Sequence, residues 1–418
     1  MHSRRFGIIT INYESMFSMA FLLWPVLNTY GFLIETVGLG DILILLVSVV
    51  CLAKKGINNQ TGKKPLYPKY FAFTIFVSIC SYFITQTGNS YGIALSLIRR
   101  IVYVIVFSAI APRIVDQTKL INQYKKISMI LAAVVFLQFF LHYVSGYSEP
   151  FIINSNLFPV RDVSGYTSYM NNWHIHLAYE QYKAPSLFTE ASKYAHYVVP
   201  CMLLSLLTTH QRRNYLYELF ISASLLATFS ANAVVFMIVA WCCWFLFARE
   251  NKNKYTKYLV GMIGIVALVS LLLGDNWFTI RINEIGNGMT SGSMRVLRGW
   301  IIYGMLPTFN KIFGVGIGNV SSYIELNGIR TGFDAGYLGY MSGLSEVAVA
   351  SGIISLVFIV LVFLKYFLKG GSTGKSMSIL LLVMLLSSAI LETPTYGISI
   401  LILEIALRNN SVKDEERI

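Results

Sequence analysis

Twelve apolar segments follow one another along the chain, and most are close to the length of a membrane-spanning helix. They lie near 16–34, 38–53, 70–85, 91–112, 127–146, 194–209, 215–230, 232–248, 258–274, 343–364, 377–391 and 395–407. A spanning helix needs about 20 mainly apolar residues, and several of these segments are shorter, so their ends are approximate. The pattern predicts an all-α polytopic membrane protein with about 12 transmembrane helices.

Two long polar stretches, 147–193 and 275–342, interrupt this pattern, whereas the other connections are short. We therefore expect a single integral membrane domain over 1–418 with two long loops outside the bilayer. In the second loop, Ser293-Met294-Arg295-Val296-Leu297-Arg298-Gly299-Trp300 predicts the start of an amphipathic helix that ends near Pro307. Arg295 and Arg298 are three residues apart, which places them on one helical face.

Composition supports a membrane protein. Hydrophobic residues make up 55% of the chain and charged residues 13%, with a mean hydropathy of +0.60. Soluble domains have about 25% charged residues. The five cysteines all lie in apolar stretches without a C-x-x-C pair, which indicates neither a disulfide framework nor a metal site.

The net charge of +13 comes from a one-sided distribution of basic residues. Of the 33, 23 lie in the alternate set of connections that includes both ends of the chain, eight lie in or beside the two long loops, and two lie inside a segment. This is the positive-inside pattern, so we expect cytoplasmic termini, long loops on the opposite side of the membrane and no nucleic-acid partner. Arg4 and Arg5 precede an apolar segment without a small-residue cleavage site, which is typical of a retained first helix.

Arg99 and Arg100 are the two basic residues inside an apolar segment, the fourth. At 1.5 Å per residue they lie about 10–12 Å below its outer end. An arginine at this depth usually faces a cavity or a partner. Because adjacent helical positions point about 100° apart, the two cannot both address one small target. The alternatives are a cavity for a charged ligand, or snorkelling and a structural pairing with an acid.

The first long loop combines aromatic and polar side chains, among them Arg161, Trp173 and His176. Aromatic faces beside polar groups suit pyranose rings, and the alternative is an interfacial aromatic belt. His174 and His176 lack further ligands at usable spacing, so we expect no metal there.

Glu190 stands where this loop ends and the sixth segment begins. Thr189 is predicted to cap that helix, and Glu190 in its first turn complements the helix dipole. The alternative role for Glu190 is that of a functional carboxylate at the outer membrane face.

The second loop carries Arg281, Arg295, Arg298, Asp334 and Tyr337. Its run Gly314-Val315-Gly316-Ile317-Gly318-Asn319 lacks a surrounding βαβ unit, so we expect it to turn the backbone tightly toward the membrane. The chain has no G-x-x-x-x-G-K-[ST], H-E-x-x-H or G-x-S-x-G motif and no Asp-x-Asp pair for a metal-bound diphosphate. Basic side chains must then do any phosphate binding.

Three short elements carry a resemblance to a known family. Leu187-Phe188-Thr189-Glu190-Ala191-Ser192 resembles the F-x-E-[PA]-S element of bacterial O-antigen polymerases (Wzy-type). Ser293-Met294-Arg295, Trp300 and Phe313-Gly314-Val315-Gly316-Ile317-Gly318-Asn319 resemble the second-loop pattern of the O-antigen ligase/polymerase superfamily, and Asp334-Ala335-Gly336-Tyr337-Leu338 with Ser345-Glu346 resembles the stretch that follows. The resemblance covers about 185–360.

There are two departures from the family pattern. Ala191 stands where many relatives have proline, and the second loop has no histidine, although the ligases carry one there. The second departure favours a polymerase over a ligase.

The resemblance implies a reaction at the periplasmic face of the bacterial inner membrane. A glycan on undecaprenyl diphosphate is transferred, with inversion, to the sugar of an incoming lipid-linked repeat unit, and no cofactor is expected. Arginine suits a metal-independent diphosphate leaving group, and an acceptor hydroxyl needs a base. We expect Arg295 and either Glu190 or Asp334 to be catalytic. The residues expected to bind diphosphate or sugar are Arg99, Arg100, Arg161, Arg281, Arg298, Trp173, His176 and Tyr337.

Other functions stay open at this point. An O-antigen ligase or a capsule or exopolysaccharide polymerase would use similar elements. A lipid-linked oligosaccharide flippase would also have about twelve helices, but transporters tend to show internal repeats, and this chain shows no six-plus-six similarity. A chain-length regulator and a flippase in the same membrane are the protein partners that the resemblance allows.

Overall fold

The computed structural model describes residues 13–32, 34–55, 67–85, 90–115, 117–147, 151–152, 155–161, 182–208, 215–248, 294–331, 341–388 and 393–415. Helices make up most of this part of the chain. They are α1 (Tyr13–Leu27), α2 (Leu39–Lys55), α3 (Tyr67–Thr85), α4 (Ser90–Val104), η1 (Ile105–Ile110), α5 (Ala111–Ile114), α6 (Gln117–Ser145), α9 (Ala191–Thr208), α10 (Leu216–Ala227), α11 (Ala231–Phe247), η2 (Met294–Arg298), α15 (Gly299–Met305), α16 (Thr308–Phe313), α17 (Val320–Leu326), α18 (Gly343–Lys369), α19 (Gly371–Ser387) and α20 (Pro394–Glu415).

Apart from the segment near 258–274, which lies outside the described residues, each predicted apolar segment overlaps one or more helices, with ends that differ. Within the described part of the chain, four helices are long and apolar enough to cross a membrane: Tyr67–Thr85, Ser90–Phe107, Thr118–Ser145 and Gly343–Lys369. Four shorter ones, Leu39–Ala53, Leu216–Ala227, Ala231–Phe247 and Gly371–Ser387, are also apolar. Large apolar side chains on them are exposed, for example Phe76 at 64% and Phe83 at 69%, as expected where lipid replaces water. The all-α membrane class is thus supported.

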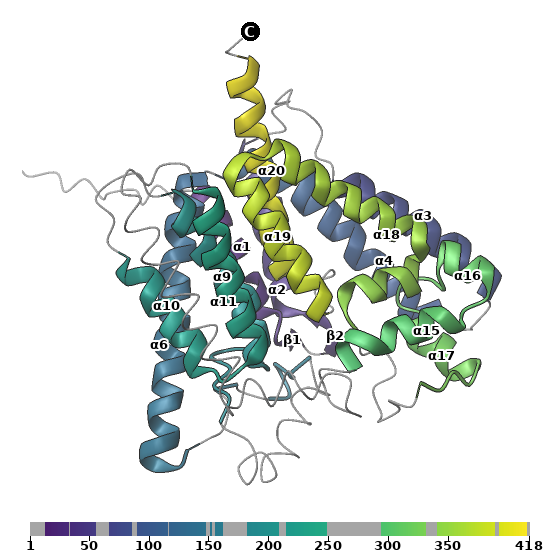
Figure 1. Ribbon diagram of the computed structural model, residues 1–418, viewed down its shortest axis with the longest axis horizontal. Coiled ribbons are helices and arrows are strands. Elements are labelled where there is room, and N and C mark those ends of the chain that lie inside the picture. The colour runs from purple at the N-terminus through teal and green to yellow at the C-terminus, as the bar shows by residue number, and fades with distance from the viewer. Residues whose placement is uncertain are drawn as a thin grey trace, which may run out of the picture.

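The helices form two groups with a central set between them (Figure 1). Helices α6, α9, α10 and α11 pack together on one side, and α3, α4 and α18 on the other. Helices α1, α2, α19 and α20 lie between the two groups. Buried aromatic rings join α1 to the fourth segment, where Trp24 stacks on Phe107 at 5.6 Å and meets Tyr103 edge-on at 5.0 Å.

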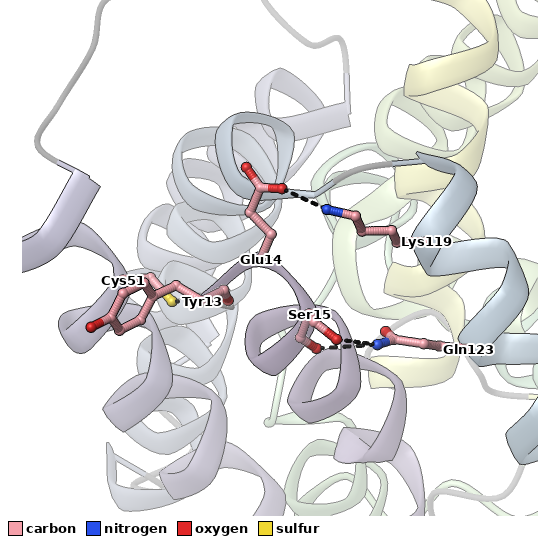
Figure 2. A network of polar contacts seen from close by, with 6 residues as sticks. All are labelled: Tyr13, Glu14, Ser15, Cys51, Lys119 and Gln123. Atoms are coloured by element: carbon pink, nitrogen blue, oxygen red, sulfur yellow. Dashed lines mark hydrogen bonds and ion pairs between the residues drawn. The ribbon is translucent and has the colours of Figure 1, made fainter. Parts of the chain in front are cut away.

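One end of the bundle gathers the start of α1, the end of α2 and the start of α6. Figure 2 shows Glu14 paired with Lys119 at 3.3 Å, and Gln123 donating to the Ser15 hydroxyl at 2.7 Å. The Cys51 thiol donates to the Tyr13 carbonyl at 3.6 Å. The exposed ion pair stabilises the fold by about 1 kcal/mol or less. These contacts nevertheless place the start of α1, the end of α2 and the start of α6 at the same end of the bundle. This arrangement is expected of a chain that crosses a membrane repeatedly.

The opposite end holds a small β-hairpin that the hydropathy pattern did not predict. Strands β1 (Gly31–Phe32) and β2 (Ile34–Gly38) pair antiparallel. The first apolar segment was predicted to reach residue 34, but its helix ends at Leu27. Beyond it, the chain pairs with the first long loop: Gly31 N–H donates to the Pro159 carbonyl at 2.7 Å, and Tyr30 bridges Val160. Strand pairing therefore replaces the last turns of the predicted helix.

The second long loop contains the predicted helix, which runs through η2 and α15 and ends before Pro307. The glycine run that follows α16 turns tightly, as predicted: Gly314, Gly316 and Gly318 have φ of 79°, 98° and 75°. These left-handed values favour glycine because a Cβ would clash with its own backbone. The run brings the chain against α18, whose helix is broken at Gly352 with φ 77°.

Candidate functional site

An ion pair joins the two long loops. The Arg295 guanidinium lies 3.5 Å from the Glu190 carboxylate, although the residues are 105 apart in sequence. Arg295 belongs to η2, and Glu190 directly precedes α9. Their side chains are 21% and 34% exposed, so the pair is open to solvent on one side. Two of the predicted catalytic residues therefore meet at one place.

A buried turn before α9 positions Glu190. Ser186 has a φ of 59°, a left-handed conformation that is costly for a residue with a Cβ. Gln138, buried in α6, offsets this cost: its Oε1 accepts the Ser186 N–H at 2.8 Å and its Nε2 donates to the Ser186 carbonyl at 3.0 Å. The Ser186 hydroxyl donates to the Leu131 carbonyl at 2.8 Å. The turn is therefore fixed to α6 at three points.

Glu190 occupies the cap position of α9. Its carbonyl accepts the N–H groups of Lys193 and Tyr194, and the Ser192 hydroxyl donates to Oε2 of its carboxylate at 2.8 Å. Thr189 was expected to cap this helix, but the helix begins one residue later than that role requires. The Thr189 hydroxyl instead accepts a hydrogen bond from the Lys193 ammonium at 2.8 Å.

Arg298 lies three residues after Arg295 and is 1% exposed. The next residue, Gly299, touches the start of α18: a Cβ there would lie 2.1 Å from the Ser345 hydroxyl. Glycine thus allows η2 and α15 to pack directly on α18. Of the two arginines, Arg295 is the one whose side chain faces Glu190 and remains partly exposed.

His196 is a candidate that sequence reasoning missed. It is buried in α9, packs against Phe236 with ring centroids 4.9 Å apart, and lies within electrostatic range of Arg295 and Lys193. Its spacing of four residues places it on the same helical face as Ser192, whose hydroxyl donates to Glu190. That spacing was the available signal. Burial of this imidazole disfavours its protonated form, so His196 is better suited to packing within the bundle than to accepting a proton.

Arg161 forms a second charged cluster at the hairpin. Its Nη1 donates to Asn28 Oδ1 at 2.6 Å and lies 3.4 Å from Asp41 Oδ2, while the Trp24 indole donates to Asp41 Oδ1 at 2.8 Å. Burial, and then the charge of Arg99, lower the pKa of Arg161, whereas Asp41 opposes the shift. The charge of Arg99 therefore acts on Arg161 across space.

Arg100 is held elsewhere, between α3 and α4. It is 4% exposed, donates to the Thr74 hydroxyl at 3.0 Å, and lies over the Phe71 ring at 5.5 Å. Arg99 and Arg100 thus address different neighbours. The geometry of Arg100 fits a polar anchor between two helices.

The remaining predicted residues, Asp334, Arg281, Trp173, His176 and Tyr337, lie outside the described residues. Among the residues that the structure does describe, no group of three or more His, Cys, Asp and Glu side chains could hold a metal ion. The five cysteines all lie within described helices and form no disulfide bond there.

The chemistry available at the ion pair is that of a carboxylate and a guanidinium that share one partly exposed position. A guanidinium binds phosphate through parallel N–H donors, and a carboxylate accepts a proton from a hydroxyl. An anionic ligand that draws Arg295 away leaves Glu190 held by the Ser192 hydroxyl. Binding of an anion and release of a base are thus coupled at this position.

What the site can do rests on these residues and their geometry alone. No protein-family model matches the chain, and no curated protein matches its sequence.

Proposed function

We propose that the protein is an O-antigen polymerase, a metal-independent inverting glycosyltransferase that joins undecaprenyl-diphosphate-linked repeat units. The contact between Glu190 and Arg295 carries the proposal. Glu190 and Arg295 belong to two of the three elements that resemble the polymerase family. Their contact places a carboxylate that can act as a base beside a guanidinium that can bind diphosphate. This pairing is what transfer from a lipid diphosphate to a sugar hydroxyl requires.

Arg295 binds the diphosphate of the donor. Diphosphate is already a good leaving group, so the transition state needs charge stabilisation more than proton donation. A planar guanidinium supplies it through two parallel hydrogen bonds without a metal. The donor diphosphate competes with Glu190 for this guanidinium, because both are anions within reach of the same group.

Glu190 acts as the base. The acceptor hydroxyl attacks the anomeric carbon of the donor, the new glycosidic bond forms as the bond to diphosphate breaks, and the hydroxyl proton passes to the Glu190 carboxylate. One displacement of this kind inverts the anomeric centre. The Ser192 hydroxyl holds Oε2 in place during the transfer. Asp334 is the alternative base.

We expect other charged and aromatic residues of the chain to bind the substrate. Arg161 and Arg99 are two basic residues whose charges interact, and Arg161 lies beside the hairpin. Arg298 follows Arg295 by three residues and is buried. Arg281, Trp173, His176 and Tyr337 belong to the same two loops. The charge asymmetry of the connections supports a bacterial inner membrane protein with cytoplasmic termini and a periplasmic site.

The product pattern of a strain that lacks the protein tests this proposal. Loss of a polymerase leaves single repeat units on lipopolysaccharide and no ladder. Bare core with long polymer accumulating on the lipid carrier identifies a ligase instead. Bare core with repeat units trapped on the cytoplasmic side identifies a flippase. Either of the last two patterns overturns the proposal.

A further inference from the structure

The short helix α16 exposes three large apolar side chains, next to an exposed Thr308 and a half-buried Lys311. Its exposed large side chains are apolar: Phe309 is 42% exposed, Ile312 36% and Phe313 37%. The polar Asn310 is turned inward, 7% exposed, and donates to the Tyr323 hydroxyl at 2.8 Å. A helix at an aqueous surface places its charged and polar residues outward. The exposed side of α16 is therefore suited to an apolar environment.

The segment after α16 contacts α3 and α18 at positions inside these two helices and not at their ends. Gly314 packs on Ala350, and Gly352 packs on the Ile312 carbonyl, where added Cβ atoms would approach backbone atoms to 2.4 and 2.0 Å. Ser78 of α3, whose hydroxyl accepts the Ile317 N–H, is seven residues from the end of that helix at Thr85, which corresponds to about 10 Å along α3. Helix α18 is one of the four long enough to cross a membrane. The end of α16 thus enters the bilayer zone beside α18.

The backbone of this segment has its hydrogen bonds satisfied within the protein. Val315 N–H donates to the Val349 carbonyl and Gly316 N–H to the Ala350 carbonyl, both at 2.9 Å, which are carbonyls near the break in α18. Two serines of α3 complete the set: the Ser78 hydroxyl accepts the Ile317 N–H at 3.2 Å, and the Ser81 hydroxyl donates to the Gly314 carbonyl at 3.2 Å. Irregular backbone at membrane depth is tolerated only when it is satisfied in this way.

We infer that residues 308–319 form a re-entrant element and that Phe309, Ile312 and Phe313 contact the acyl chains of the membrane leaflet that holds the long loops. The occupant is lipid because α16 packs on α18 and α3, whose own exposed apolar side chains already require lipid. Figure 1 shows α16 at the outer edge of the bundle beside these helices. The inference does not depend on the proposed enzymatic function.

Spin-label accessibility tests the inference on the full-length protein in phospholipid nanodiscs. Of the five cysteines, Cys80 and Cys242 are the two that are not buried, so C80A and C242A give a background with low labelling. Nitroxides are placed singly at F309C, I312C and F313C. The matched control is S321C on α17, where Ser321 is exposed and polar.

Labels at 309, 312 and 313 should collide more often with oxygen, which concentrates in lipid, than with a water-soluble nickel chelate. The label at 321 should show the reverse. Nickel access at all four positions would mean that α16 faces water and would overturn the inference. Low access to both reagents at 309–313 would mean that a second copy or another protein covers this face, which also overturns it. Quenching of a fluorophore at the same positions by brominated acyl chains gives an independent readout, and absence of quenching at all three contradicts lipid contact.

Discussion

Both polar atoms of the Gln138 side-chain amide bind the backbone of Ser186. Oε1 accepts the Ser186 N–H at 2.8 Å, and Nε2 donates to the Ser186 carbonyl at 3.0 Å. The two residues are 48 apart in sequence, and both are buried. Because Glu190 follows Ser186 by one turn, this contact sets where the carboxylate stands. Gln138 is therefore a positioning residue for the ion pair.

Q138L should destabilise the fold by about 2–4 kcal/mol, since it removes two hydrogen bonds and leaves a buried N–H without a partner. Q138E keeps the acceptor for the Ser186 N–H and should retain more stability. L137A changes a neighbouring half-exposed residue and serves as the control. Thermal unfolding of the purified protein measures the difference, and equal melting temperatures for Q138L and L137A would contradict the role of Gln138.

G352A should destabilise the contact between α16 and α18 by about 2 kcal/mol or more. Its φ of 77° is strained for alanine, and the added Cβ meets the Ile312 carbonyl. G304A is the matched control, because nothing lies within 4 Å of a Cβ there and alanine favours the helix. We expect G352A to speed proteolysis within 294–331 and G304A to leave it unchanged or slower. The same cleavage rate in both variants would show that the glycine contact does not hold this segment.

The predicted topology is tested by thiol labelling in a cysteine-free background. S155C and N287C, in the two long loops, should react with a membrane-impermeant reagent in intact spheroplasts. N59C should react only after lysis, because the positive-inside pattern places that connection in the cytoplasm. Protection of both loop positions in intact spheroplasts would invert the orientation and remove the periplasmic site.

E190Q should lose most polymer while the protein keeps its membrane level, because removing an acid–base group typically lowers the rate by about 10²–10⁴. The amide preserves size and still offers an oxygen to the Ser192 hydroxyl, so the turn should stay folded. D334N tests the alternative base in the same strain. If both variants give full-length polymer, neither carboxylate is the base, and H174Q and H176Q in the first long loop become the next variants to assay.

Hydropathy predicted the helices well because each buried or lipid-facing stretch is continuous in sequence. It failed beyond Leu27, where the first apolar segment was predicted to continue to residue 34 although Tyr30 pairs with Val160 of a distant loop. Pairing partners so far apart leave no local signal.

The sequence predicted individual residues of the site but not which of them lie in contact. Glu190 and Arg295 were each expected to act, but nothing local shows that they touch across 105 residues. Asp41 and His196 escaped notice because each stands alone in an apolar segment. The break at Gly352 escaped for a related reason, since a single glycine is common in a membrane helix and its strained φ depends on the approach of Gly314.

The assay of Arg295 variants in a strain without the chromosomal copy tests the central claim most directly. R295A should abolish the lipopolysaccharide ladder and leave single repeat units, and R295K should restore it poorly, because a point charge cannot reproduce the planar fork that grips a diphosphate. Membrane levels of both variants must match that of the unaltered protein. A full ladder from R295A at that level would contradict the account, because Arg295 would then take no part in transfer.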